Sequence, residues 1–68
     1  MKNKIKELRK QRKISQDELA YEVGVTRQTI TSIECEKYTA SLILAYKIAK
    51  YFNMKIEEVF DFNEIEEL

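Results

Sequence analysis

The stretch from Ser15 to Glu34, SQDELAYEVGVTRQTITSIE, decides the fold of this chain. Ser15 is followed three residues later by Glu18, which is the spacing of a capping box and predicts that a helix begins after Ser15. Gly24 predicts the end of that helix, because glycine adopts the left-handed conformation without steric cost. Thr26 is a typical N-cap for a second helix. The stretch therefore predicts two short helices joined by a tight turn.

Apolar spacing predicts how these two helices pack. The residues expected to face the core are Leu19, Ala20, Val23, Ile30 and Ile33. Two helices joined by such a short turn cross at a steep angle. Only a small side chain fits at the crossing, and Ala20 is placed there. The sequence thus predicts a helix-turn-helix at about residues 16–35.

The rest of the chain is also predicted to be helical. We expect helices over residues 2–12, from near Ser41 to Phe52, and from about Ile56 to Phe60. The inward face of the fourth helix is predicted to hold Leu42, Ala45, Ile48, Ala49 and Phe52. Asn53 is expected to be a left-handed C-cap. The fold class is therefore all-α, a compact five-helix bundle in a single domain spanning 1–68. Phe60 and Phe62 alternate, so a short C-terminal extended segment is also open.

Composition argues against an enzyme. The chain has 68 residues, one cysteine (Cys35) and no histidine. A lone thiol forms neither an internal disulfide nor a zinc site, and serine–histidine or cysteine–histidine catalysis is excluded. Paired carboxylates remain, but a short helical chain offers little cleft in which to desolvate them. We expect no catalytic residue, no metal and no cofactor.

Targeting signals are not evident. No apolar run approaches the ~20 residues that span a bilayer, and the start, MKNKIKELRKQRK, lacks the apolar core of a signal peptide. The expected location is the cytoplasm. No effector domain or small-molecule effector is evident.

A polar stripe is predicted on the second helix of the motif. With its two isoleucines turned inward and about 100° per residue, Gln28 and Ser32 point outward and Thr31 flanks them. Arg27 projects from the N-terminal end. Glutamine and arginine form paired hydrogen bonds with adenine and guanine edges. A solvated polar face explains the stripe equally well when it is taken alone.

Residues 4–60 resemble the phage-repressor-like (Xre/Cro-type) helix-turn-helix family. The matching segments are IKELRKQRKISQDELA, GVTRQTI, SIECEKY and SLILAYKIAKYFNMKIEEVF. The resemblance implies a lambda-repressor-like DNA-binding domain whose third helix enters the major groove of duplex DNA. By position, it implies base contacts from Arg27, Gln28, Thr31 and Ser32. It implies phosphate contacts from Gln16, Thr29, Lys37 and Tyr38.

The same resemblance implies a structural ion pair between Arg9 and Glu34, where the alternative is a solvated basic cluster around Arg9. The chain departs from the family pattern after the third helix. Cys35 and Glu36 replace a common Asn-Gly pair, so the helix either runs on to Glu36 or ends on a strained residue. Ala40 replaces a common proline. Both changes bear on the loop Glu36–Ala40.

Charge is divided along the chain, which holds 12 basic and 12 acidic residues. Residues 1–13 carry a net charge of +6 and residues 56–68 carry −6. We expect the basic groups to gather near the helix-turn-helix and the acids to gather at the far end. The other interpretation is that both runs only keep the chain soluble.

The C-terminal region, about 56–68, has more apolar residues than one small core needs. We expect Val59, Phe60 and Phe62 to contribute to a homodimer interface. The predicted function is a sequence-specific transcriptional regulator, a repressor more than an activator, that binds a pseudo-palindromic operator as a homodimer. The alternative is an antitoxin-type module that neutralises a protein partner and binds DNA secondarily.

Overall fold

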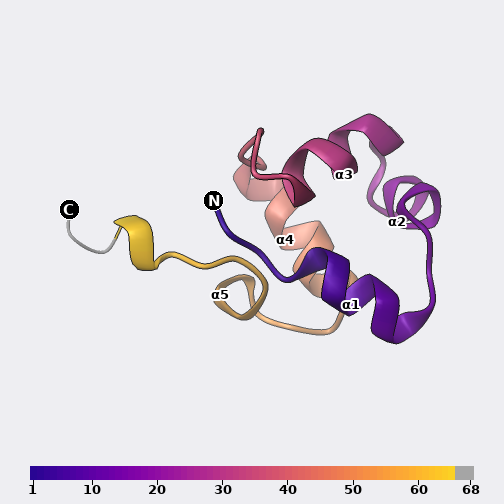
Figure 1. The fold of residues 1–68 in the computed structure, drawn as a ribbon. Coiled ribbons are helices and arrows are strands. Elements are labelled where there is room, and N and C mark those ends of the chain that lie inside the picture. Colours follow the sequence, from indigo (N-terminus) through magenta and orange to yellow (C-terminus); the bar gives the residue numbers. More distant parts are fainter. Residues whose placement is uncertain (66–68) are drawn as a thin grey trace.

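The structure, a computed structural model, describes residues 1–65. Its α-helices are α1 (Ile5–Arg12), α2 (Gln16–Val23), α3 (Arg27–Glu34), α4 (Leu42–Tyr51) and α5 (Ile56–Val59), followed by a 3-10 helix, Asn63–Ile65. Figure 1 shows α2 at the opposite end of the molecule from the C-terminal segment. The all-α, five-helix prediction is confirmed. Residues 66–68 of the predicted dimerisation region lie outside the described residues.

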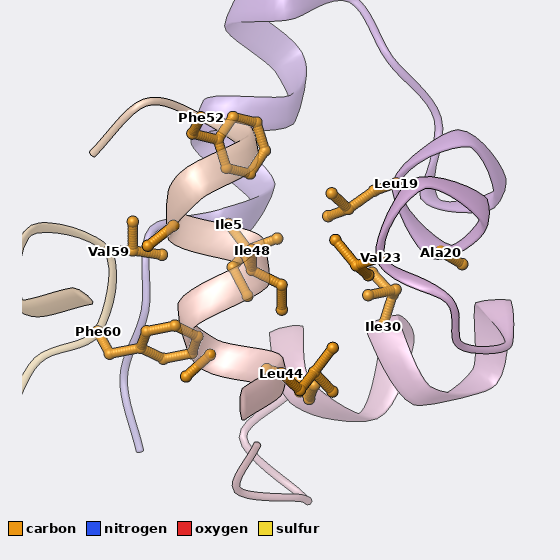
Figure 2. Packing of buried hydrophobic residues seen from close by; sticks show 13 residues of the cluster. Ile5, Leu19, Ala20, Val23, Ile30, Leu44, Ile48, Phe52, Val59 and Phe60 are labelled. Carbon is orange, nitrogen blue, oxygen red and sulfur yellow. The ribbon is translucent and has the colours of Figure 1, made fainter. Parts of the chain in front are cut away.

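One hydrophobic core joins all five helices. Leu19, Ile30 and Ile48 are fully buried, and Ala20 is 3% exposed. Figure 2 shows Leu19 and Val23 of α2 and Ile30 of α3 turned toward Ile48 of α4. The five core positions predicted for the helix-turn-helix are all buried. This packing fixes the inner face of α3 and leaves its other face outside.

The predicted N-caps are formed. The Ser15 hydroxyl accepts a hydrogen bond from the Glu18 backbone N–H at 3.0 Å, and the Glu18 carboxylate accepts one from the Ser15 N–H at 3.4 Å. The Thr26 and Ser41 hydroxyls each accept from the backbone N–H three residues later. These contacts satisfy N–H groups that a helix start leaves unpaired, so local sequence alone sets where α2, α3 and α4 begin.

The first four helices share one kind of C-terminal end. After each helix a residue with positive φ is followed by a backbone N–H that bonds the carbonyl five residues earlier, which is the Schellman arrangement. The four residues are Lys13, Gly24, Glu36 and Asn53. Gly24 and Asn53 were predicted as left-handed, whereas Lys13 was not. At Gly24 an added Cβ would meet no atom within 4 Å, so the backbone angle of 76° and not space favours glycine.

Several predicted boundaries and core positions need correction. Leu42 was predicted to face inward but is 78% exposed, and Leu44, at 8%, fills the core instead. Leu44 lies one turn before Ile48 on the buried face, while Leu42 lies at the edge of that face. The first helix begins at Ile5 and not at residue 2, and α5 ends at Val59.

The N-terminal residues pair in extended conformation with the residues around Phe60. Asn3 and Phe60 form an isolated antiparallel bridge, so the extended pairing that the sequence left open is present at Phe60 and does not reach Phe62. The Lys4 N–H donates to the Val59 carbonyl at 2.8 Å, and the Asn3 side-chain amide donates to the Ile33 carbonyl at 2.9 Å. The N-terminal residues therefore connect α5 to the end of α3. Within the described residues, no helix has the length and hydropathy needed to cross a bilayer.

Candidate nucleic-acid interface

The outer face of α3 carries the predicted stripe. Arg27 and Gln28 are exposed, while Thr29, Thr31 and Ser32 are half-buried. The inner face is closed by Ile30 at 0% and Ile33 at 2% exposure. The helix thus presents an arginine, a glutamine and hydroxyl groups away from the core, all of which can bond to nucleic-acid edges or phosphates.

The single carboxylate of α3 is turned away from this face. Arg9 Nε donates to Glu34 Oε2 at 2.7 Å, Arg9 Nη2 donates to Glu34 Oε1 at 3.1 Å, and Arg9 Nη1 donates to the Ile14 carbonyl at 3.1 Å. The side chains of Arg9 and Glu34 are 11% and 5% exposed. The structure therefore contains the expected ion pair in a two-pronged, nearly buried form. Pairing with Arg9 neutralises a charge that would otherwise repel phosphates.

A polar network joins α2 to α3 beside the stripe. Gln16 Nε2 donates to Glu34 Oε1 at 3.0 Å. Gln16 Oε1 accepts from Thr31 Oγ1 at 3.1 Å and from Arg27 Nε at 3.4 Å. Sequence analysis assigned Gln16 a phosphate contact and did not predict these bonds. The sequence offered one indication of this network, since Gln16 and Arg27 are the first residues of the two helices that cross.

Tyr38 belongs to the same surface. An open hollow is lined by Thr26, Gln28, Thr29, Ser32 and Tyr38. A second hollow, also lined by Thr29 and Tyr38, includes Lys47 of α4. The predicted base-contacting residues Gln28 and Ser32 thus lie with the predicted phosphate-contacting residues Thr29 and Tyr38. Lys47 was missed as a candidate, since only the tertiary fold brings the outer face of α4 next to Tyr38.

The loop after α3 follows the second of the two expected alternatives. The helix ends at Glu34, Cys35 is its C-cap, and Glu36 adopts a φ of 64°. A side chain in this region clashes with the following carbonyl group, which costs ~1–2 kcal/mol. Lys37 and Tyr38 follow directly and are exposed. The loop is therefore a defined turn that carries some backbone strain.

Replacing Glu36 by glycine is expected to stabilise the chain by about 1 kcal/mol, because glycine has no steric penalty at positive φ. The change also removes a negative charge two residues beyond α3, so it should tighten binding to duplex DNA at low salt. Urea unfolding and a DNA titration would measure both effects. Lys13→Gly is the matched control, since Lys13 has a φ of 57° at the end of α1. It should give the same gain in stability without a gain in DNA affinity. Equal gains in DNA affinity for both variants would contradict the placement of Glu36 near the bound DNA.

The C-terminal apolar residues are placed differently from the prediction. Val59 and Phe60, predicted for a dimer interface, are 1% and 4% exposed because they fill the core of a single chain. Phe62 is half-buried. Large apolar side chains that are exposed include Leu42 at 78% and Tyr46 at 54%. In this conformation the side chains of Val59 and Phe60 are not available to a partner.

The expected separation of charge is wrong for the first residues of the chain. Lys2 and Lys4 line the same hollow as Glu57, Glu58 and Asp61, because the extended N-terminal residues pair with those that follow α5. Opposite charges therefore meet where the N-terminal residues lie beside α5. Among the basic side chains, Arg27 is exposed on α3, Lys47 lines a hollow with Thr29 and Tyr38, and Lys37 is exposed in the loop that follows α3.

Comparisons with known proteins all find helix-turn-helix proteins or proteins of similar fold. A helix-turn-helix family model (HTH_3) matches residues 5–59. A protein of Archaeoglobus fulgidus named as an uncharacterized HTH-type transcriptional regulator is 53% identical over 66 residues, which cover 97% of this chain and 93% of the relative. The crystal structure of the restriction-modification controller protein C.AhdI from Aeromonas hydrophila aligns with a TM-score of 0.76 and 28% identity, covering 82% of this chain and 85% of that one. A chain of the SinR protein/SinI protein complex also aligns with a TM-score of 0.76 and 28% identity, covering 94% of this chain and 62% of that one.

Proposed function

We infer the function from one premise: this chain belongs to the helix-turn-helix family of Xre/Cro-type transcriptional regulators. We propose that it binds duplex DNA in a sequence-specific manner, with α3 in the major groove, and represses transcription as a homodimer on a pseudo-palindromic operator. The observation that carries the proposal is the outer face of α3, where Arg27 and Gln28 are exposed while Glu34 is paired internally. The major groove of duplex DNA admits one α-helix. The base edges in that groove carry hydrogen-bond acceptors and donors to which arginine and glutamine side chains can bond.

Two sets of contacts are proposed. Bases are contacted by Arg27, Gln28, Thr31 and Ser32. Phosphates are contacted by Thr29, Lys37 and Tyr38, to which we add Lys47 because it lines a hollow with Thr29 and Tyr38. Gln16 is also proposed as a phosphate contact, because the family pattern places it there. Phosphate contacts fix the position of the helix, and base contacts supply the sequence preference.

Gln28→Ala is expected to weaken binding to the preferred operator by about 1–3 kcal/mol and to relax preference at one base pair. The operator is first selected from a random duplex pool, and affinities are then measured on it and on random duplex. Lys37→Ala is the comparison variant. It should weaken binding to both duplexes alike and reduce the salt slope by about one. Equal losses on both duplexes for Gln28→Ala would show that this residue does not read sequence.

Homodimerisation is the second part of the proposal. Proteins of this kind read two half-sites related by two-fold symmetry, which places the two recognition helices about 34 Å apart. A small chain buries only about 60% of its surface and gains stability from pairing. The exposed apolar side chains of Leu42 and Tyr46 are candidates for the contact, together with Phe62. Light scattering at tens of micromolar should give twice the monomer mass, and a monomer mass would overturn this part.

Repression is proposed because a small domain that occupies a promoter needs no further surface to block transcription. Binding to chromosomal DNA would place the protein in the cytoplasm, at the nucleoid. A reporter gene placed behind the selected operator should fall in expression when the protein is supplied. A rise in expression would identify an activator.

A second candidate is a module whose main partner is another protein, as in an antitoxin. The observation that favours it is that one of the similar folds belongs to a chain of the SinR protein/SinI protein complex, which is an assembly of two different proteins. The exposed Leu42 and Tyr46 offer an apolar surface for such a partner. Co-purification of a stoichiometric protein partner that displaces the chain from its operator would favour this candidate.

A further inference from the structure

An open hollow lies between the end of α2 and the second half of α4. It is lined by Tyr21, Glu22, Val23, Gly24, Lys47, Lys50 and Tyr51. Tyr21 is 84% exposed, although an aromatic ring gains from being covered. The hollow has no lining residue in common with the one on the outer face of α3. Apart from Lys47, none of its charged or aromatic residues has a part in the proposed DNA contacts.

This α2–α4 hollow combines positive charge with aromatic rings. Lys47 and Lys50 outnumber the single carboxylate, Glu22. The Lys50 ammonium lies 5.8 Å from the centre of the Tyr46 ring, and Tyr46 is 54% exposed. Ammonium groups pair with carboxylates, while tyrosine rings cover apolar side chains. The partner that fits is therefore a segment in which acidic and apolar residues are interspersed.

The segment that follows α5 has this composition. Residues 61–68, DFNEIEEL, contain four carboxylates and no basic side chain. Their apolar residues recur at every third position, as Phe62, Ile65 and Leu68. Phe62 packs against the core, whereas Ile65 is 46% exposed. The core therefore holds the start of the segment and leaves Ile65 exposed, and Glu66 and Glu67 follow Ile65 in the sequence.

The segment does not reach the hollow of its own chain. Figure 1 shows α2 and the C-terminal 3-10 helix at opposite ends of a molecule whose longest dimension is 35 Å. The start of the segment is held in place, because the Asp61 N–H donates to the Lys2 carbonyl at 2.9 Å. Glu67 follows Ile65 by two residues, so their Cα atoms are at most about 7 Å apart. A segment of this kind that fills the hollow must come from another copy of the chain.

We propose that residues 65–68 of one copy dock in the α2–α4 hollow of a second copy, with carboxylates at Lys50 and apolar side chains against Tyr21 and Tyr51. Because the segment and the hollow lie at opposite ends of the chain, the contact is head-to-tail and can join copies in a row. It differs from a two-fold homodimer, in which both copies use the same surface. The contact does not depend on DNA, and on DNA it links copies bound at adjacent operators.

The test measures self-association of the full chain without DNA, by sedimentation at low salt. A contact of this size belongs to the weak, transient class, so species larger than a dimer should form above about 100 μM. Lys50→Glu should weaken this association about ten-fold or more, since like charges across an interface repel each other. The tail variant, Glu66→Lys combined with Glu67→Lys, should weaken it as much. Mixing the two variants should restore the larger species, because the acidic segment of the first meets the intact hollow of the second.

Two further variants identify the surface. Lys6→Glu makes the same change of charge at an exposed residue of α1 and should leave self-association within about two-fold of wild type. Tyr21→Ala removes a ring that is 84% exposed. It should weaken self-association about five-fold or more while the melting temperature stays near that of wild type.

A wild-type chain that forms nothing larger than a dimer at about 500 μM would overturn the proposal and leave the hollow to a different partner. Equal losses with Lys6→Glu and Lys50→Glu would overturn it as well, because overall charge alone would then govern self-association. Absence of larger species after the Lys50→Glu and tail variants are mixed would rule out the head-to-tail contact.

Discussion

Replacing Glu34 by alanine is expected to lower the free energy of unfolding by about 3–5 kcal/mol, because it leaves the Arg9 guanidinium nearly buried without its partner. The paired side chains are only 11% and 5% exposed, so the guanidinium would regain little contact with water. The Gln16 amide loses its acceptor in the same step. One substitution thus removes a charged contact to α1 and a hydrogen bond to α2.

Urea unfolding followed by circular dichroism would measure this effect. For a domain of this size each 1 kcal/mol shifts the melting temperature by about 4–8 °C, so a fall of more than about 10 °C is expected. Glu22→Ala removes an exposed carboxylate of α2 and should change stability by less than about 0.5 kcal/mol. A fall of only a degree or two for Glu34→Ala would mean that the ion pair contributes little.

Ile30→Ala is expected to destabilise the chain by about 2–5 kcal/mol, because this fully buried side chain fixes α3 to the core. The loss combines removal of apolar surface from the interior with the cavity that remains. Ile30→Val removes one methylene group and should cost about 0.5–1.5 kcal/mol. Binding of DNA should weaken only as far as the folded fraction falls, since Ile30 faces away from the proposed groove.

The matched control for this series is Ile43→Ala, which removes the same atoms from a side chain that is 69% exposed. It should stay within about 0.5 kcal/mol of wild type. Unfolding measured at low protein concentration compares the three variants directly. Similar losses at positions 30 and 43 would show that α3 is not held by its inner isoleucines.

Helix starts and the core of the helix-turn-helix could be predicted from the sequence because they depend on neighbours along the chain. Ser15, Thr26 and Ser41 accept hydrogen bonds from N–H groups three residues later, at a spacing visible in the sequence. The helical repeat likewise gives Ile30 and Ile33 one face and Gln28 the opposite one. These features need no knowledge of how the helices are arranged.

Helix ends were only partly predictable. Gly24 and Asn53 are residue types that tolerate positive φ, so their turns could be predicted from the sequence. Lys13 and Glu36 adopt the same conformation without such a preference. At these two sites the Schellman hydrogen bonds form around a residue that has a side chain, and that residue carries the strain. The sequence around Glu36 allowed two outcomes, and the structure has the second, with α3 ending at Glu34 and Glu36 at a φ of 64°.

The amino-acid sequence was enough to predict two capped helices, a small residue at their crossing and a polar stripe on the second helix. Each of these features depends on contacts between residues that are close along the chain. Tertiary structure alone decided which apolar and charged groups meet over long separations. It buried Val59 and Phe60 in one chain, exposed Leu42, and brought Lys2 and Lys4 beside the acids in and just after α5. It also joined Gln16 to Arg27 and Glu34, because the crossing angle of two helices, and not their spacing along the chain, sets the distance between side chains.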